Sequence, residues 1–321
     1  METEEEKLQE QLCCACEKGN IEEVKQLLQN NPQININCLD YYSPAQKTPF
    51  SLACEKGHIE IVKLFLNDQR VNVNFGNLFY GQPPLYSACL FNQIEIVKLL
   101  LNNERIDINL KDKFYRTPFY IACYQGRIEI VKLFLLSDRM VHINQADKFD
   151  QIPFWVACQN GQTEVVKLLL NDKRADINKM DKNGITPFWI ACNRSNLEIV
   201  EYMLADGREV NINAKNNKEQ SAIDIARKNS KEEKDVFETV ERCERRKRNF
   251  SMIIKLLESF ERDPIETRIK LRIQLEFVGK SLFLYFFIFF ISYLFLFQFA
   301  RNYYFSFEKV KMLLLCLQSW F

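Results

Sequence analysis

Glycine and histidine are both scarce in this chain of 321 residues. Its nine glycines fall well below the roughly 7% of average proteins, and two histidines leave little for acid–base or metal chemistry. The GxGxxG, GxxxxGK[ST], HExxH and GxSxG motifs are missing. We therefore expect no enzyme activity, no catalytic residues, no cofactor and no bound metal.

An excess of charge of one sign is also missing. Lysine and arginine number 43 against 42 aspartates and glutamates, so the net charge is +1. No long-range field favours nucleic acid, and we predict no nucleic-acid partner. The first residues, METEEEKLQEQ, lack the charged and then apolar start of a secretory signal. This predicts that the folded region lies in reducing cytosol.

The 11 cysteines do not look like a disulfide framework. Cys13 and Cys16 form a CxxC pair, but no second pair or histidines complete a zinc site. Five further cysteines each follow an alanine at a fixed spacing, which is typical of small buried residues. They are Cys54, Cys89, Cys123, Cys158 and Cys192.

An internal repeat of 34 to 35 residues organises most of the chain. One phrase recurs as TPFSLACEKG, PPLYSACLFN, TPFYIACYQG, IPFWVACQNG and TPFWIACNRS. A second phrase follows each at constant distance, as in IEIVKLFL, IEIVKLLL and TEVVKLLL. ACEKGNIEEVKQLL is a degenerate first copy, and SAIDIARKN begins the last.

Each first phrase predicts a short helix with marked ends. Thr48, Thr117 and Thr186 can cap the helix with a hydroxyl, and the proline that follows tolerates the first turn. Gly57 is typical of a helix end, whereas Asn92 and Ser195 suit that position less well. The second phrase predicts a helix with an acid in its first turn and, in four copies, a lysine three residues later.

This pattern resembles the ankyrin repeat: a TPL-type start, an alanine pair, a glycine stop and an EVVKLLL-type second helix. The resemblance implies an all-α solenoid of helix–turn–helix repeats with short β-hairpin or turn connections. The histidine of the family's TPLH tetrapeptide, which usually ties adjacent repeats together, is replaced by Ser51, Tyr120 or Trp189. We expect Trp155 and Trp189 in the core and His58 to be structural.

Members of this family bind proteins along a concave face made by turn tips and first helices. Exposed aromatic residues favour an interface, although the tip aromatics could instead fold back on neighbouring tips and stiffen the array. The positions predicted to bind a partner are Tyr41, Tyr42, Phe79, Tyr80, Leu90, Phe91, Phe114, Tyr115, Tyr124, Gln125, Phe149, Gln159, Asn160 and Arg194.

We divide the chain into four parts. About seven repeats span residues 8–260, the last with a charged insertion near 229–249; a basic linker spans 261–280, an apolar segment spans 281–300 and a tail spans 301–321. Glu238, Glu241 and Glu244 each precede an arginine by four residues, which favours a solvated helix. The run RRKR within it could otherwise be a nuclear signal or a lipid patch.

Residues 281–300 carry no charge and are long enough for one membrane-spanning, hydrophobic helix. We expect a C-terminal anchor, with the repeats facing the cytoplasm as a monomeric adaptor for a protein partner. A soluble cytoplasmic scaffold is the alternative, because read-through of T-rich noncoding DNA would give a tail of the same composition. A single span is too little for a channel subunit without oligomers.

Overall fold

The computed structural model describes residues 3–40, 45–232 and 238–275, and every regular element among them is a helix. Those in the repeats run in pairs, a first helix followed by a second helix. The helices are α1 Glu4–Lys18, α2 Ile21–Asn30, α3 Pro49–Lys56, α4 Ile59–Asn67, α5 Pro84–Leu90, α6 Ile94–Leu101, α7 Pro118–Gln125, α8 Ile128–Leu135, α9 Pro153–Gln159, α10 Thr163–Asn171, α11 Pro187–Asn193, α12 Leu197–Ala205, α13 Ala222–Ser230, α14 Val240–Arg262 and α15 Pro264–Gln274.

The helix ends follow the predicted signals. Thr48, Thr117 and Thr186 each accept a hydrogen bond from the N–H three residues on, and proline occupies the first turn. Gly57 closes α3 in the left-handed conformation. Asn92 and Ser195 adopt the same conformation at the equivalent positions, with φ of 62° and 56°, at a cost that glycine would avoid.

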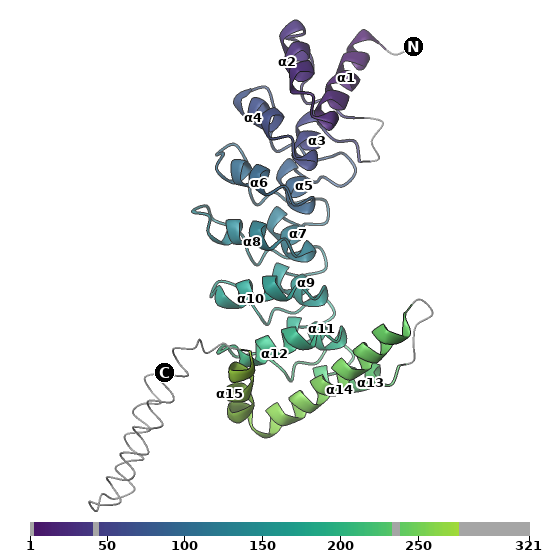
Figure 1. Ribbon diagram of the computed structural model, residues 1–321, viewed down its shortest axis with the longest axis vertical. Helices are drawn as coiled ribbons and strands as arrows, with labels where there is room; N and C mark the ends of the chain where they lie inside the picture. Colours follow the sequence, from purple (N-terminus) through teal and green to yellow (C-terminus); the bar gives the residue numbers. More distant parts are fainter. Residues whose placement is uncertain (1–2, 41–44, 233–237, 276–321) are drawn as a thin grey trace, which may run out of the picture. The chain divides into compact units, whose positions relative to one another are not determined.

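Within residues 1–264 the pairs stack in two columns (Figure 1). Each first helix from α1 to α13 packs on the next first helix, and α2, α4, α6, α8, α10, α12 and α14 form the second column. The alanine–cysteine pairs, such as Ala53–Cys54 and Ala88–Cys89, are completely buried between first helices, as predicted for small core residues. Trp155 and Trp189 are also buried, which confirms their assignment to the core.

The connections between pairs are turns, and the described residues contain no strand. The turn tip at 112–116 is closed by a bond from the Asp112 N–H to the Arg116 carbonyl, at 3.0 Å. The tip at 147–151 has the same bond between Asp147 and Gln151, also at 3.0 Å. These tips are tight turns. Of the two kinds of connection that the family resemblance implied, β-hairpin or turn, the described residues therefore show the turn.

The last repeat differs from its predicted form. The predicted insertion near 229–249 is not separate from the second helix of this repeat. Its second half, from Val240, forms the first part of α14, which continues into the expected second helix. Glu244 pairs with Arg248 at 3.7 Å, as predicted. The predicted place of Glu238 in this helical ladder is wrong, because Glu238 lies before the helix begins. Its carboxylate accepts hydrogen bonds from Arg246 at 2.9 and 3.0 Å.

A second unit begins at Ile265, and α15 lies in the part of the chain predicted as a linker. None of the helices in the described residues is both long and apolar enough to cross a membrane. The predicted span at 281–300 and the tail at 301–321 lie outside the described residues.

Candidate interaction surface

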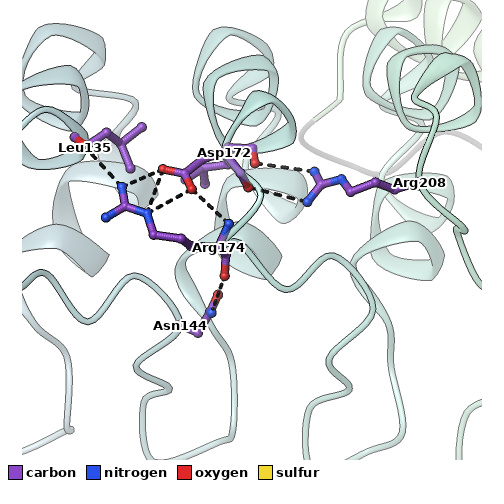
Figure 2. Close-up of polar contacts among 6 residues, drawn as sticks. Leu135, Asn144, Asp172, Arg174 and Arg208 are labelled. Carbon is purple, nitrogen blue, oxygen red and sulfur yellow. Dashed lines mark hydrogen bonds and ion pairs between the residues drawn. The ribbon is translucent and has the colours of Figure 1, made fainter.

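Asparagine side chains bridge consecutive connections along the stack. The Asn144 amide donates to the Arg174 carbonyl at 2.8 Å and accepts from the Asp176 N–H at 2.9 Å. Figure 2 shows the first of these bonds. The same pair of bonds, to the next connection along the chain, is made by Asn37, Asn74, Asn109 and Asn178. Because both bonds use backbone groups of the following repeat, this ladder fixes the spacing of the connections.

An arginine ladder closes the ends of the second helices. The Arg174 guanidinium holds the Asp172 carboxylate at 2.6 Å and donates to the Leu135 carbonyl at 3.2 Å (Figure 2). Arg208 donates in turn to carbonyls of the preceding repeat, including that of Leu170 at 2.8 Å. Hydrogen bonds from Arg174 keep the pKa of Asp172 below its ordinary value. The orphan carbonyls at these helix ends are thus satisfied by the next repeat.

The tie between repeats that the missing histidine would have made is present in another form. Tyr120 donates its hydroxyl to the Asp147 carboxylate at 3.0 Å. Trp155 donates its indole N–H to the Ile185 carbonyl at 2.9 Å, and Trp189 does the same to Gln220 at 3.0 Å. Burial and the nearby Asp147 raise the pKa of Tyr120, so it stays a donor. His58 adds a contact of 2.9 Å to the Glu17 carbonyl, a structural role as predicted.

Buried aspartates shape the turn tips. In the tip at 147–151, Asp147 accepts hydrogen bonds from the backbone N–H groups of Phe149 and Gln151, at 2.8 and 3.0 Å. Asp112 and Asp181 organise their own tips in the same way. The tips also bond to one another, because the N–H of Lys148 donates to the Phe114 carbonyl at 3.0 Å. These bonds make the tips a connected edge rather than separate loops.

We define the tip row as the described residues 78–80, 113–115, 148–150 and 182–183. Five of the predicted partner-binding residues lie in it: Phe79, Tyr80, Phe114, Tyr115 and Phe149. Phe79, Tyr115 and Phe149 are 55%, 58% and 51% exposed, and Tyr80 is also exposed. Tyr41 and Tyr42, which were predicted to belong to the same row, lie outside the described residues.

Phe114 is the tip aromatic that fits the alternative interpretation, in which the rings stiffen the array. It is half-buried. The Arg116 guanidinium lies 4.9 Å from its ring centroid, and the Lys148 ammonium lies 4.1 Å from it. These cation–π contacts occupy Phe114 within the stack. They leave the outer aromatics Phe79, Tyr115 and Phe149 open to solvent.

Tyr115 combines two unfavourable features. Its φ is +65°, a left-handed conformation that bulky residues rarely adopt; Asp150, Gly184 and Glu219 take it at the equivalent place in later tips. Its side chain is also 58% exposed. The turn explains the backbone conformation, but neither backbone preference nor burial explains a bulky aromatic residue there, which makes Tyr115 a candidate functional position.

The first-helix row comprises the other predicted positions that the structure describes, which lie at the C-terminal ends of α5, α7, α9 and α11 or directly after them. Phe91, Tyr124, Asn160 and Arg194 are exposed, whereas Leu90, Gln125 and Gln159 are half-buried. The Lys47 ammonium lies 5.9 Å from the Phe91 ring centroid and is paired with the largely buried Glu55. The predicted set therefore divides between exposed side chains and side chains that are partly covered by the stack.

Three lysines of the tip row were not predicted. Lys113, Lys148 and Lys182 each follow the buried aspartate that opens a tip. Lys113 and Lys182 are exposed, and Lys148 is half-buried beside Phe114. The recurring Asp-Lys pair at the start of each tip is the sequence signal that identifies these lysines.

The described part of the chain contains no group of three or more histidine, cysteine, aspartate or glutamate side chains able to hold a metal ion. Cys13 is buried with its sulfur 3.8 Å from that of Cys38, and the contact with Cys38 together with burial raises the pKa of the Cys13 thiol. Burial likewise raises the pKa of the Cys54 thiol. Protonated, buried thiols of this kind are poor nucleophiles.

A family model described as ankyrin repeats (3 copies) matches the chain over residues 12–112, 105–181 and 154–239. The overlapping matches cover more than half of the chain and confirm the predicted resemblance. No curated protein matches the chain.

Proposed function

The chain belongs to the ankyrin-repeat family, and we propose that it is a non-enzymatic interaction module that binds a protein partner through the tip row and the first-helix row. Repeat stacks present extended surfaces that other proteins can cover. The observation that carries the proposal is Tyr115, a tyrosine that is 58% exposed at a turn position with φ of +65°, where a bulky residue is unfavourable. A partner that covers this tyrosine would bury its exposed ring, and burial of a tyrosine side chain contributes strongly to binding.

The rigidity of the surface supports the same function. The asparagine ladder, the tip-to-tip backbone bonds and the ties from Trp155 and Trp189 hold the tips in register. A surface held in its binding conformation loses less conformational entropy when a partner binds. Rigid aromatic side chains such as Phe79 and Phe149 are also the residue type that dominates protein interfaces.

The proposal is tested with F79A/Y115A/F149A in the full-length chain, against a partner identified by affinity capture. Removing three exposed aromatics should weaken binding at least about tenfold, because each is a candidate hot spot. The matched control is L136A/M140A, which removes two side chains that are 81% and 80% exposed outside the tip row. An affinity that falls equally in both variants, or in neither, would refute the assignment of the surface.

We further propose that residues 281–300 anchor the protein in a membrane with the repeats facing the cytoplasm. The support is the sequence, in which this segment is uncharged and matches the length of one bilayer crossing. Carbonate extraction of the full chain, beside a version that ends at Asp263, tests the anchor. Retention of only the full chain in the membrane pellet supports it. If both versions are extracted, the soluble scaffold is the correct form.

A further inference from the structure

We propose that the partner segment bound by the tip row is acidic and apolar, with carboxylates beside aromatic or aliphatic side chains. This inference rests on the proposed function and specifies the chemistry of the partner. It rests on an excess of accessible lysines over accessible carboxylates along the tip row, although the net charge of the whole chain is only +1.

Accessible cations recur along the tips. Lys113 and Lys182 are exposed, and Lys148 is half-buried between two tips. Asp150 is the exposed carboxylate among the described tip residues 112–116, 147–151 and 181–185. Lysines therefore outnumber acids at the part of this edge that a partner can touch.

The other tip carboxylates are turned inward and occupied. Asp112 pairs with Arg116 at 2.6 Å and has no exposed side-chain surface. Asp147 and Asp181 are buried and accept hydrogen bonds from the backbone of their own tips. Carboxylates that are buried and hydrogen-bonded cannot pair closely with the lysines outside them, so the lysines keep their capacity for a partner.

The lysines of the second helices differ from the tip lysines because their charges are paired with glutamates. Lys63, Lys98 and Lys132 each pair with the glutamate three residues earlier, at 2.7 to 2.8 Å. Lys167 pairs with both Glu164 and Glu198. These lysines of the second helices are thus neutralised by glutamates, whereas the aspartates beside the tip lysines are buried and bonded within their own tips.

Two of the tip lysines are also held in place by contacts with neighbouring tip residues. The Lys148 ammonium lies 4.1 Å from the Phe114 ring centroid and 5.1 Å from that of Phe149. The Lys113 ammonium donates to the Leu78 carbonyl at 2.6 Å. A partner with a carboxylate next to an aromatic or aliphatic side chain would pair with Lys148 and pack on Phe149 together. Side chains already held in place lose less entropy on binding.

Aromatic residues beside lysines would also suit single-stranded nucleic acid. A protein segment fits better, because Asp150 is exposed among the lysines. Its carboxylate interrupts the continuous positive charge that a phosphate backbone requires.

The experiment selects binders to the full-length protein from a displayed library of random peptides. The selected peptides should be rich in aspartate and glutamate together with aromatic or aliphatic residues, and their affinity should fall as salt is raised. K113E/K148E/K182E should weaken a selected peptide roughly tenfold or more, and exchanging the peptide's acids for lysines should restore binding. K63E/K98E/K132E, the same number of reversals on the second helices, should leave the affinity unchanged.

The outcomes separate this inference from the proposed function. Peptides that are neutral or basic but lose affinity with F79A/Y115A/F149A would refute the acidic partner and keep the binding surface. Peptides insensitive to both tip variants would refute the binding surface as well. Tight binding of fluorescent polyuridylate that is lost in K113E/K148E/K182E would show a nucleic-acid surface and overturn the inference.

Discussion

The indole N–H of Trp155 donates to the carbonyl of Ile185 at 2.9 Å, which links a first helix to the turn tip of the following repeat. Trp189 makes the same bond to Gln220 one repeat later. A side chain that belongs to the core of one repeat thereby fixes the position of the next tip. The bond of Trp155 thus ties the last tip of the tip row, at 181–185, to the first helix before it.

Trp155→Phe tests the bond. Phenylalanine keeps most of the buried ring but leaves the Ile185 carbonyl without its donor, so the free energy of unfolding should fall by about 1 to 2 kcal/mol. Urea denaturation followed by circular dichroism measures the change. A midpoint equal to that of the wild type would show that the hydrogen bond contributes nothing.

Asn144→Ala should remove two bonds between repeats, to the Arg174 carbonyl and the Asp176 N–H. The loss expected is about 1 to 3 kcal/mol of unfolding free energy, because two hydrogen bonds between repeats are broken. Asn183→Ala is the matched control, since the described contact of its side-chain amide is one long bond of 3.4 Å within its own tip. Equal losses in the two variants would show that the ladder is not a source of stability.

Asp172 should make stability depend on pH. Hydrogen bonds from Arg174 lower the pKa of Asp172 below its ordinary value of 3.8. A depressed pKa contributes stability that is present above the unfolded-state value and lost as pH falls through the folded-state value. The stability advantage of the wild type over Asp172→Asn should therefore be full at neutral pH and shrink below about pH 4. A gap that stays constant down to pH 2 would contradict the ion pair.

Tyr115→Gly separates binding from folding. Glycine adopts a φ of +65° without strain, although it also increases the entropy of the unfolded chain. Because the two effects oppose each other, we expect the free energy of unfolding to stay within about 1 kcal/mol of the wild type. Binding should weaken in the same variant. A large loss of stability would instead indicate that the tyrosine has a structural role.

The repeats themselves could be predicted because their signals are local. Thr117 and Pro118 begin a helix and Gly126 ends it within one phrase, and that phrase recurs along the chain. The ties between repeats could not be predicted. The sequence shows a tryptophan at position 155 in place of histidine, but its bond to Ile185 joins residues 30 apart whose geometry appears only in the folded stack.

The candidate surface was predicted less completely. The exposure of Phe79, Tyr115 and Phe149 could be expected from their turn positions. Phe114 could not be distinguished from them, because its contacts with Arg116 and Lys148 come from its own tip and from the next one. In the last repeat, Thr239 caps α14 within the predicted insertion, so the second helix begins earlier than its apolar pattern indicated.

The most direct test of the binding surface is photo-crosslinking in cells. A photoreactive phenylalanine analogue replaces Tyr115 in one version of the full chain and Leu136, which is 81% exposed away from the tip row, in another. The proposed function predicts a discrete crosslinked protein band from position 115 that is absent from position 136. Crosslinking of the same partner from position 136 alone, or equal crosslinking from both positions, would contradict it.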